Sequence, residues 1–298
     1  MIIISFGCGL GNQMFEYAFY LSMKKVYPNV EIKADMQYAL PIEHNGYELE
    51  KIFGICIEES TLREVLKYSE YIPRKKKYFM LRVLRFIRKK FGRAKKSFYV
   101  QKDFTEFYSD VYSLEAEKNY YLLGIWGNEK YFLGMEHILK NDVFVFPMER
   151  LNHRSKEYKD MIESKETSIS VHIRKGDFVQ YNNPILSRVY YEKAMKIVRE
   201  KYSNITFFVF SDDEIYAKEL LIELDNVVFI NGNYGNDSWM DMYLMSICKH
   251  NIIANSSFSF WGAYLNKNIN KLVIAPNVAF RNCKNAFTCK EWIILDMD

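Results

Sequence analysis

The segment Ser168–Gln180, SISVHIRKGDFVQ, joins a buried strand to a cluster of charged side chains. Its first half, Ser168–Ile173, is a short β-rich run, and Arg174, Lys175 and Asp177 follow it directly. In open α/β sheets, ligands bind in the crevice beyond the carboxyl ends of the strands. The charges therefore lie where the sheet is expected to open onto a ligand.

The C-terminal half alternates apolar β-rich runs with stretches of helical spacing, which predicts a parallel sheet with helices on both faces. The predicted strands are Ser168–Ile173, Ile205–Ser211, Val227–Asn231, Asn251–Ala254 and Lys271–Ala275. The predicted helices are 188–201, 213–223, 238–249 and 259–266.

The N-terminal half begins with the same alternation. A strand, a glycine-rich turn, a helix and a second strand are predicted at Ile2–Phe6, Gly7–Asn12, Gln13–Val26 and Val30–Ala34. Further strands are predicted at Tyr120–Trp126 and Val143–Phe146, and the polar helical stretch Met148–Lys165 is the best place for a domain boundary. We therefore expect an α/β fold of two Rossmann-like domains facing each other across a cleft, residues 1–155 and 156–298.

Composition is that of a packed globular protein, with 298 residues of which 49% are hydrophobic. The five cysteines are an odd number without C-x-x-C spacing, which argues against zinc sites and disulfide frameworks and favours a reducing compartment. The start lacks a signal peptide, and no apolar run reaches the roughly 20 residues that span a bilayer. We expect a cytoplasmic protein.

The net charge of +4 conceals a basic segment, residues 74–96, with twelve Lys and Arg and no Asp or Glu. Apolar residues interleave with these charges, so a basic amphipathic helix is predicted, inserted in the N-terminal domain. It could contact the anionic inner face of a membrane, or it could pack its apolar side on the protein and leave its basic face in solvent. Nucleic-acid binding is disfavoured because the rest of the chain is acidic.

Polar groups follow three strands of the predicted C-terminal sheet and together describe a site for a nucleoside diphosphate. The planar fork of Arg174 suits a phosphate, and a Ser-Ser pair before a helix can join the helix N-terminus in holding negative charge. The candidates are His172, Arg174, Asp212, Asn255, Ser256, Ser257 and Phe258. Structural alternatives are an Arg174–Asp177 ion pair and helix N-caps at Asp213 and at Ser257 or Ser259.

The glycine-rich turn near the N-terminus also has a second interpretation. Gly7, Gly9 and Gly11 with Asp35 suggest a dinucleotide fingerprint and an NAD-dependent oxidoreductase, but Asn12 stands where its third glycine belongs. The five histidines show no paired ligand spacing, so no metal is expected.

Five blocks of the sequence resemble one family over nearly the whole chain. They are GCGLGNQMFEYA at the start, GIWGNEKYF at 124–132, VHIRKGDF at 171–178, FSDD at 210–213 and CKHNIIANSSFSFWGAYLN at 248–266. In this order they are similar to the bacterial α-1,2-fucosyltransferases of glycosyltransferase family 11. The family usually has H-x-R-R-x-D-Y in the third block, so Lys175 and Phe178 are departures, as is Gly127 in the second.

The resemblance implies a GT-B fold, GDP-β-L-fucose as donor, and inverting transfer that forms an α-1,2 linkage without a metal or other cofactor. The acceptor implied is a galactose-terminated glycan, free or lipid-linked. It also implies site roles: Arg174 at the diphosphate, His172 and Asp212 at the guanosine end, the Ser256–Phe258 loop at the phosphates, and Asn12, with Gly9 and Gly11, near the transferred sugar. For the base that takes the acceptor proton, Asp35 and Glu129 are both plausible by position.

Overall fold

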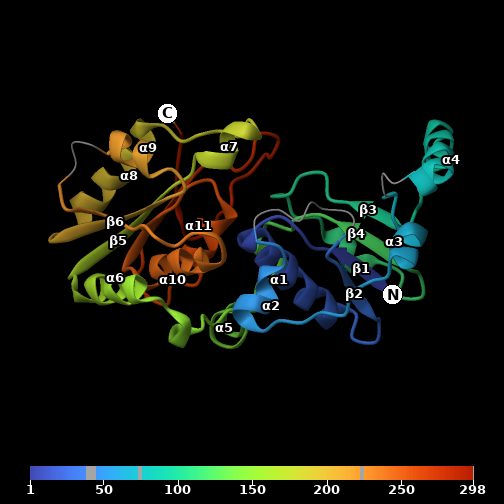
Figure 1. The fold of residues 1–298 in the computed structure, drawn as a ribbon, viewed down its shortest axis with the longest axis horizontal. Coiled ribbons are helices and arrows are strands. Elements are labelled where there is room, and N and C mark those ends of the chain that lie inside the picture. The colour runs from blue at the N-terminus through green and yellow to red at the C-terminus, as the bar shows by residue number, and fades with distance from the viewer. Residues whose placement is uncertain (38–44, 73–75, 222–224, 298) are drawn as a thin grey trace. The chain divides into compact units, whose positions relative to one another are not determined.

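The computed structural model describes residues 1–37, 45–72, 76–221 and 225–297, which fall into two compact units. Unit 1 comprises Met1–Trp126 with Lys130–Phe132, and unit 2 comprises Gly127–Glu129 and the chain from Leu133 onward. Each unit is built on one parallel sheet with helices beside it (Figure 1). The predicted α/β class with two sheets is confirmed.

Unit 1 contains a four-stranded sheet in the order β2-β1-β4-β3. Its strands are β1 (Ile2–Ser5), β2 (Ile32–Asp35), β3 (Phe98–Val100) and β4 (Tyr120–Leu123). Its α-helices are α1 (Leu10–Val26), α2 (Glu48–Phe53), α3 (Leu62–Tyr68) and α4 (Phe79–Lys90), with short turns η1 (Lys76–Tyr78), η2 (Ser109–Ser113) and, at its border with unit 2, η3 (Glu129–Tyr131). All four residues of β1 are buried, so the hydrophobic strand forms the centre of this unit.

Unit 2 contains a six-stranded sheet in the order β10-β9-β8-β5-β6-β7. Its strands are β5 (Thr167–Ile173), β6 (Ile205–Ser211), β7 (Val227–Phe229), β8 (His250–Ile252), β9 (Val273–Pro276) and β10 (Ile293–Leu295). The chain adds strands on one side of β5 and then crosses to β8 on the other side. The strand order therefore reverses between β5 and β8, which is where such sheets bind ligands.

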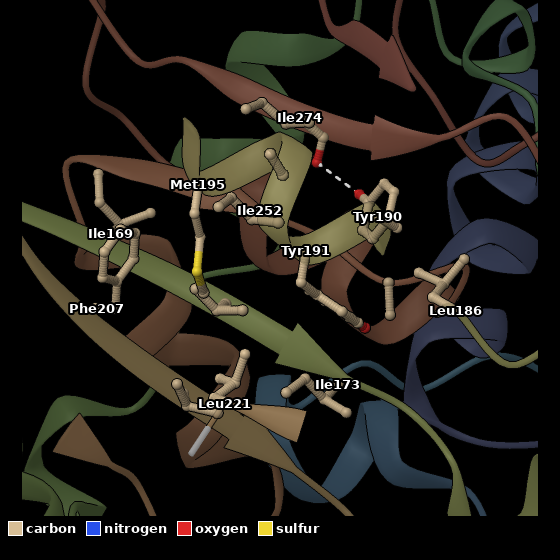
Figure 2. Packing of buried hydrophobic residues seen from close by; sticks show 14 of the residues in the cluster. Ile169, Ile173, Leu186, Tyr190, Tyr191, Met195, Phe207, Leu221, Ile252 and Ile274 are labelled. Atoms are coloured by element: carbon tan, nitrogen blue, oxygen red, sulfur yellow. Dashed lines mark hydrogen bonds between the residues drawn. The ribbon is translucent and has the colours of Figure 1, made fainter. Parts of the chain in front are cut away.

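The helices of unit 2 cover both faces of its sheet. They are α6 (His153–Ser164), α7 (Gly176–Gln180), α8 (Arg188–Lys201), α9 (Glu214–Leu220), α10 (Trp239–Ile247) and α11 (Ser257–Tyr264), with short turns α5 (Glu136–Ile138), η4 (Leu139–Val143), η5 (Met148–Arg150) and η6 (Gly235–Asp237). Figure 2 shows Tyr190, Tyr191 and Met195 of α8 packed on the apolar side chains of the strands. The Tyr190 hydroxyl donates to the carbonyls of Ile253, at 2.7 Å, and Ile274, which fixes α8 across β8 and β9.

The opposite face of β5 carries polar side chains that bind to the next layer. The Asn251 amide donates to Ser170 Oγ at 2.7 Å and to the Met245 carbonyl at 2.8 Å, so it joins β5, β8 and α10. Asn266, at the end of α11, donates to Asn251 Oδ1 at 2.8 Å. Because these buried polar groups are paired, they lock α10 and α11 in place at little energetic cost.

The segment before α6 and the boundary between the units differ from the sequence-based predictions. The predicted strand Val143–Phe146 is wrong: a π-helical turn ends at Val143, and Phe144 and Phe146 instead pack against the indole rings of Trp261 and Trp239. Apolar character here serves contacts with helices rather than strand pairing. The predicted boundary after residue 155 lies inside unit 2, because α6 packs against α10.

In the described part of the chain, no helix combines the length and apolar character needed to cross a membrane.

Candidate functional site

The candidate site of unit 2 lies at the carboxyl edge of its sheet, around the reversal between β5 and β8. His172 is the penultimate residue of β5, Arg174 follows that strand, and Asp212 follows β6. The segment from Asn255 to Ser257 follows β8 and leads into α11. Parallel pairing of β5 with both β6 and β8 brings these predicted residues to one edge, as the sequence suggested.

Arg174 is held between two carboxylates. Its Nη2 lies 2.8 Å from both carboxylate oxygens of Asp177, and its Nη1 lies 3.2 Å from Asp212 Oδ2. The guanidinium also lies over the Phe178 ring, 5.6 Å from the centroid. The ion pair with Asp177, considered above as a structural alternative, is therefore present, and it fixes the orientation of the fork. One donor, Nε, is buried and has no hydrogen-bond partner within the described residues.

Asp212 supports the loop that carries Arg174. Its Oδ1 accepts a hydrogen bond of 2.9 Å from the Lys175 main-chain N–H, and its Oδ2 faces the guanidinium of Arg174. Gly176 permits this approach, since a Cβ there would lie 2.6 Å from Asp212 Oδ2. Both oxygens of Asp212 are thus engaged in positioning Arg174, which leaves the carboxylate poorly suited to the guanine contact that the family resemblance implied.

His172 is a neutral, buried imidazole. Its side chain is 4% exposed, and burial, followed by the positive charge of Arg174, lowers its pKa from 6.5 to about 3. The ring lies 6.0 Å from the ring of Phe258, centroid to centroid, on the face of β5 that meets α11. Within the described residues its Nδ1 has no hydrogen-bond partner. A buried ring nitrogen without a partner is costly, and a ligand hydrogen bond would remove that cost.

The N-terminus of α11 is capped by Ser256, whose Oγ accepts from the Phe258 N–H at 3.3 Å. The cap is thus one residue before Ser257, while Asp213 caps α9 as expected, accepting from the Tyr216 N–H at 2.9 Å. Asn255 plays a supporting part, because its amide donates to the carbonyls of Pro184 and Ala279. The remaining N–H groups of the first turn of α11 give this edge a positive end that suits an anion.

Asp241, in the first turn of α10, was not among the residues predicted from the sequence. The Asn251 bonds place Ser170 of β5 level with Met245 of α10. From there, two strand residues, about 6.6 Å, lead to His172, and four helical residues, about 6 Å, lead to Asp241. Because α10 runs antiparallel to β5, both steps go towards the carboxyl edge. By this register, Asp241 lies towards the carboxyl edge of the sheet, as His172 does.

The environment of Asp241 changes its titration. Burial raises its pKa from 3.8 to about 7, although the Asn233 amide, 2.7 Å from Oδ1, works in the opposite direction. A carboxyl group that titrates near neutrality at the edge of a sheet is a candidate functional group. Its signal in the sequence was an acidic residue in the first turn of a helix that follows a parallel strand, which is common enough to be overlooked.

In unit 1, the glycine-rich turn forms the start of α1, with Gly9 as the N-cap and Gly11 and Asn12 in the first turn. The carboxylate of Glu48 accepts from the Leu10 N–H at 3.1 Å. Negative charge from the protein itself thus occupies the position that a dinucleotide pyrophosphate would need, which argues against the NAD interpretation. Asn12 Oδ1 is buried and without a hydrogen-bond partner among the described residues.

The two predicted candidates for the catalytic base are placed differently. Asp35 is buried at the end of β2, where its oxygens accept from the Gln37 N–H at 3.0 Å and the Tyr121 hydroxyl at 2.5 Å. Glu129 is partly buried, accepts from the Lys290 N–H at 2.9 Å and also bonds the Cys289 thiol. Asp35 is therefore closed off by its neighbours to a greater extent than Glu129.

The five cysteines are free thiols. Within the described ranges, no three side chains of His, Cys, Asp or Glu gather closely enough to hold a metal ion. The expectation that no metal is needed remains a prediction.

Residues 1–296 match the family described as Glycosyl transferase family 11. The chain is 32% identical to the alpha-1,2-colitosyltransferase of Escherichia coli over 99% of both chains, and 31% identical over 105 residues, a third of its length, to galactoside 2-alpha-L-fucosyltransferase Sec1 of Mus musculus. A crystal structure of NodZ alpha-1,6-fucosyltransferase co-crystallised with GDP is similar in fold, with a TM-score of 0.51, 14% identity, and coverage of 88% of this chain and 91% of that one. That likeness confirms the GT-B fold class.

The buried imidazole predicts a specific loss of stability in acid. The pKa of His172 falls from 6.5 to about 3 on folding. Between pH 6.5 and pH 3, His172 is therefore protonated in the unfolded chain but neutral in the folded protein. The free energy of unfolding should fall with decreasing pH in that window, by up to about 1.4 kcal/mol per pH unit from this group. His172→Asn should remove this component, so urea denaturation of both proteins at pH 4.5 and 7 should give wild type the larger loss, by about 2 kcal/mol. If the free energy of unfolding of wild type and of His172→Asn falls equally between pH 7 and 4.5, the lowered pKa of His172 is contradicted.

Proposed function

Because the chain belongs to glycosyl transferase family 11, we propose that it transfers L-fucose from GDP-β-L-fucose to a hydroxyl group of a galactose-terminated glycan. The transfer inverts the anomeric centre and forms an α-1,2 linkage in a surface polysaccharide. The observation that carries this proposal is the oriented guanidinium of Arg174 at the same edge of the sheet as the N-terminus of α11, where the sheet order reverses.

That arrangement suits the charge that develops during the reaction. As the sugar departs, positive charge spreads over its ring while negative charge builds on the leaving diphosphate. Fixed donors aimed at the diphosphate stabilise that state more than the ground state. Arg174 can supply charge-assisted hydrogen bonds, since Asp177 and Asp212 hold its fork in one orientation. The N–H groups at the start of α11 add further donors. We propose that these groups replace a metal ion.

The guanine end is best served by His172 and Asp241. A guanine edge presents N–H donors, and Asp241 Oδ1 already accepts from Asn233, so its second oxygen is the candidate acceptor. His172, at the same edge of the sheet, offers a buried ring nitrogen that has no partner among the described residues. Asp212, which the family resemblance implied for this role, is engaged with Lys175 and Arg174 instead.

Two further residues are proposed for the reacting groups, Asn12 of unit 1 for the transferred sugar and Glu129 of unit 2 for the acceptor hydroxyl. Asn12, whose buried Oδ1 has no hydrogen-bond partner in the described part of the chain, is the candidate contact for the transferred sugar. For the base we favour Glu129 over Asp35, because Asp35 is buried and bonded to Tyr121. Glu129 accepts from the Lys290 N–H, also bonds the Cys289 thiol, and remains partly exposed.

A second candidate donor carries colitose, since one relative of high coverage is a colitosyltransferase. Incubation of the protein with a panel of galactosides and either GDP-fucose or GDP-colitose should yield a disaccharide with one donor at least tenfold faster than with the other. We expect GDP-fucose to be preferred, with activity unchanged by EDTA and by added Mg²⁺. Loss of activity in EDTA that a divalent ion restores would contradict metal independence, and no transfer from either donor would contradict the proposed function.

Replacing Arg174 by lysine tests the role of the planar fork. Arg174→Lys keeps the charge but cannot hold two oxygens together. Turnover should fall by roughly two to three orders of magnitude, about 3–4 kcal/mol of transition-state stabilisation, while GDP affinity should weaken less. The matched control is Arg188→Lys, which alters an exposed arginine paired with Glu192 and should leave turnover unchanged. If Arg174→Lys keeps near-normal turnover, Arg174 has only a structural role, in its ion pair with Asp177.

Asp241→Asn tests the guanine contact. The substitution should weaken GDP binding by about 10- to 100-fold in calorimetry, because an acceptor oxygen facing guanine N–H groups is exchanged for an amide. In wild type, GDP affinity should decrease as pH falls below about 7, since protonation of Asp241 removes that acceptor. Asp237→Asn, at an exposed position four residues earlier, is the control. Equal affinities for GDP in all three proteins would exclude Asp241 from the site.

A further inference from the structure

The helix α4 and its flanks, residues 76–96, form a strongly basic segment that we name the α4 segment. It contains ten Lys and Arg and no acidic residue. None of the side chains of the helix itself is buried. Figure 1 shows α4 at the margin of unit 1, beyond α3, where it covers neither face of the sheet.

The apolar side of α4 faces solvent. Six large apolar side chains of the helix and its C-cap are each about half or more exposed, namely Phe79 (59%), Met80 (65%), Leu84 (56%), Phe86 (70%), Ile87 (46%) and Phe91 (70%). At about 100° per residue, these positions share one arc of roughly 160°. Exposed apolar patches of this kind mark a surface that meets a partner or a membrane.

A buried carboxylate explains why this arc turns outward. Glu70, 3% exposed, accepts from Arg88 Nη2 at 2.6 Å and from the Lys95 N–H at 2.8 Å, and Arg85 Nε lies 3.7 Å away. Burial opposes ionisation of Glu70, but these donors outweigh it and its pKa is lowered. Arg85 and Arg88 lie on the side of the helix opposite the apolar arc. The contacts of Glu70 with Arg85, Arg88 and Lys95, which we name the Glu70 anchor, therefore hold the arginine side of α4 against the rest of unit 1. The alternative in which the apolar side of α4 packs on the protein is wrong.

We propose that the α4 segment is a docking site for an anionic lipid membrane. The apolar arc would enter the boundary between headgroups and acyl chains, while exposed cations in the last turn of the helix, such as Lys89 and Lys90, would contact the lipid phosphates. The helix is about 18 Å long, shorter than the roughly 30 Å of a hydrocarbon core, so attachment is peripheral.

Charge and exposure favour a membrane over other occupants. Nucleic acid would need cations rather than bulky apolar side chains on the outward face. A second copy of the chain, packed arc to arc, would bring two strongly basic segments together and repel. An anionic bilayer offers an apolar interior to the apolar arc and phosphates to the cations of the same helix. The proposal does not depend on the sugar donor or acceptor.

The experiment is flotation of the full-length protein with vesicles of phosphatidylcholine, with or without phosphatidylglycerol. We expect wild type to float only with the anionic vesicles and to dissociate as salt is raised. Leu84→Gln/Phe86→Gln/Ile87→Gln should lower vesicle affinity by about 100-fold, because three apolar side chains no longer leave water. Arg82→Gln/Lys89→Gln/Lys90→Gln should lower it by about as much, since each cation strengthens attraction to the anionic surface.

The matched control is Leu133→Gln/Ile215→Gln/Ile269→Gln, which makes three similar changes at exposed positions outside α4 and should bind vesicles like wild type. All variants should keep wild-type circular dichroism and transfer to a soluble acceptor. The proposal is overturned if wild type ignores anionic vesicles at low salt, or if the apolar variant binds as tightly as wild type. It is equally overturned if sedimentation without lipid shows a dimer that the apolar variant abolishes, because the occupant is then a second copy.

Discussion

The contact on which the candidate site depends is the pair of carboxylates that holds Arg174. Asp177 and Asp212 approach the guanidinium from two different elements, one in the following helix and one after the neighbouring strand. Their negative charge compensates the arginine within the protein, so the fork keeps one orientation before any ligand arrives. A diphosphate that reaches this edge meets a donor that needs little reorganisation, which is the condition under which fixed charge is most effective.

The sheet of unit 2 could be predicted from the sequence because its strands and helices have uniform patterns; Ile205–Ser211 and Arg188–Lys201 are found with the predicted bounds. Val143–Phe146 was misassigned because an aromatic run can serve contacts with helices as well as strand pairing. The edge strand Ile293–Leu295 was missed because it is short and partly exposed. In these places tertiary contacts, rather than local pattern, decide the structure.

The sequence predicted which residues gather at the candidate site, but it did not predict the role of each one. Strand ends identify which residues gather at the edge, but they do not say which side chains face a ligand and which support a neighbour. Asn255 supports two loops, and Asp212 supports Arg174. Asp241 belongs to the same edge only because α10 runs antiparallel to β5 at a height set by Asn251. Such relations depend on pairs of residues far apart in the sequence, for which a single sequence contains no record.

The Glu70 anchor closes the segment from residue 70 to residue 95 into a separate insertion between α3 and β3. The Lys95 ammonium donates to the Ser69 carbonyl at 2.8 Å, and Ser97 Oγ donates to the Tyr68 carbonyl at 2.9 Å. These bonds join the end of α3 to the start of β3, so the two ends of the segment from residue 70 to residue 95 lie side by side. A loop whose ends already meet can change its length and content without disturbing β3 or α3, because closing it adds little entropy cost. The stretch between those ends is therefore a position where this architecture can acquire, exchange or lose an attachment element while the sheet of unit 1 stays the same.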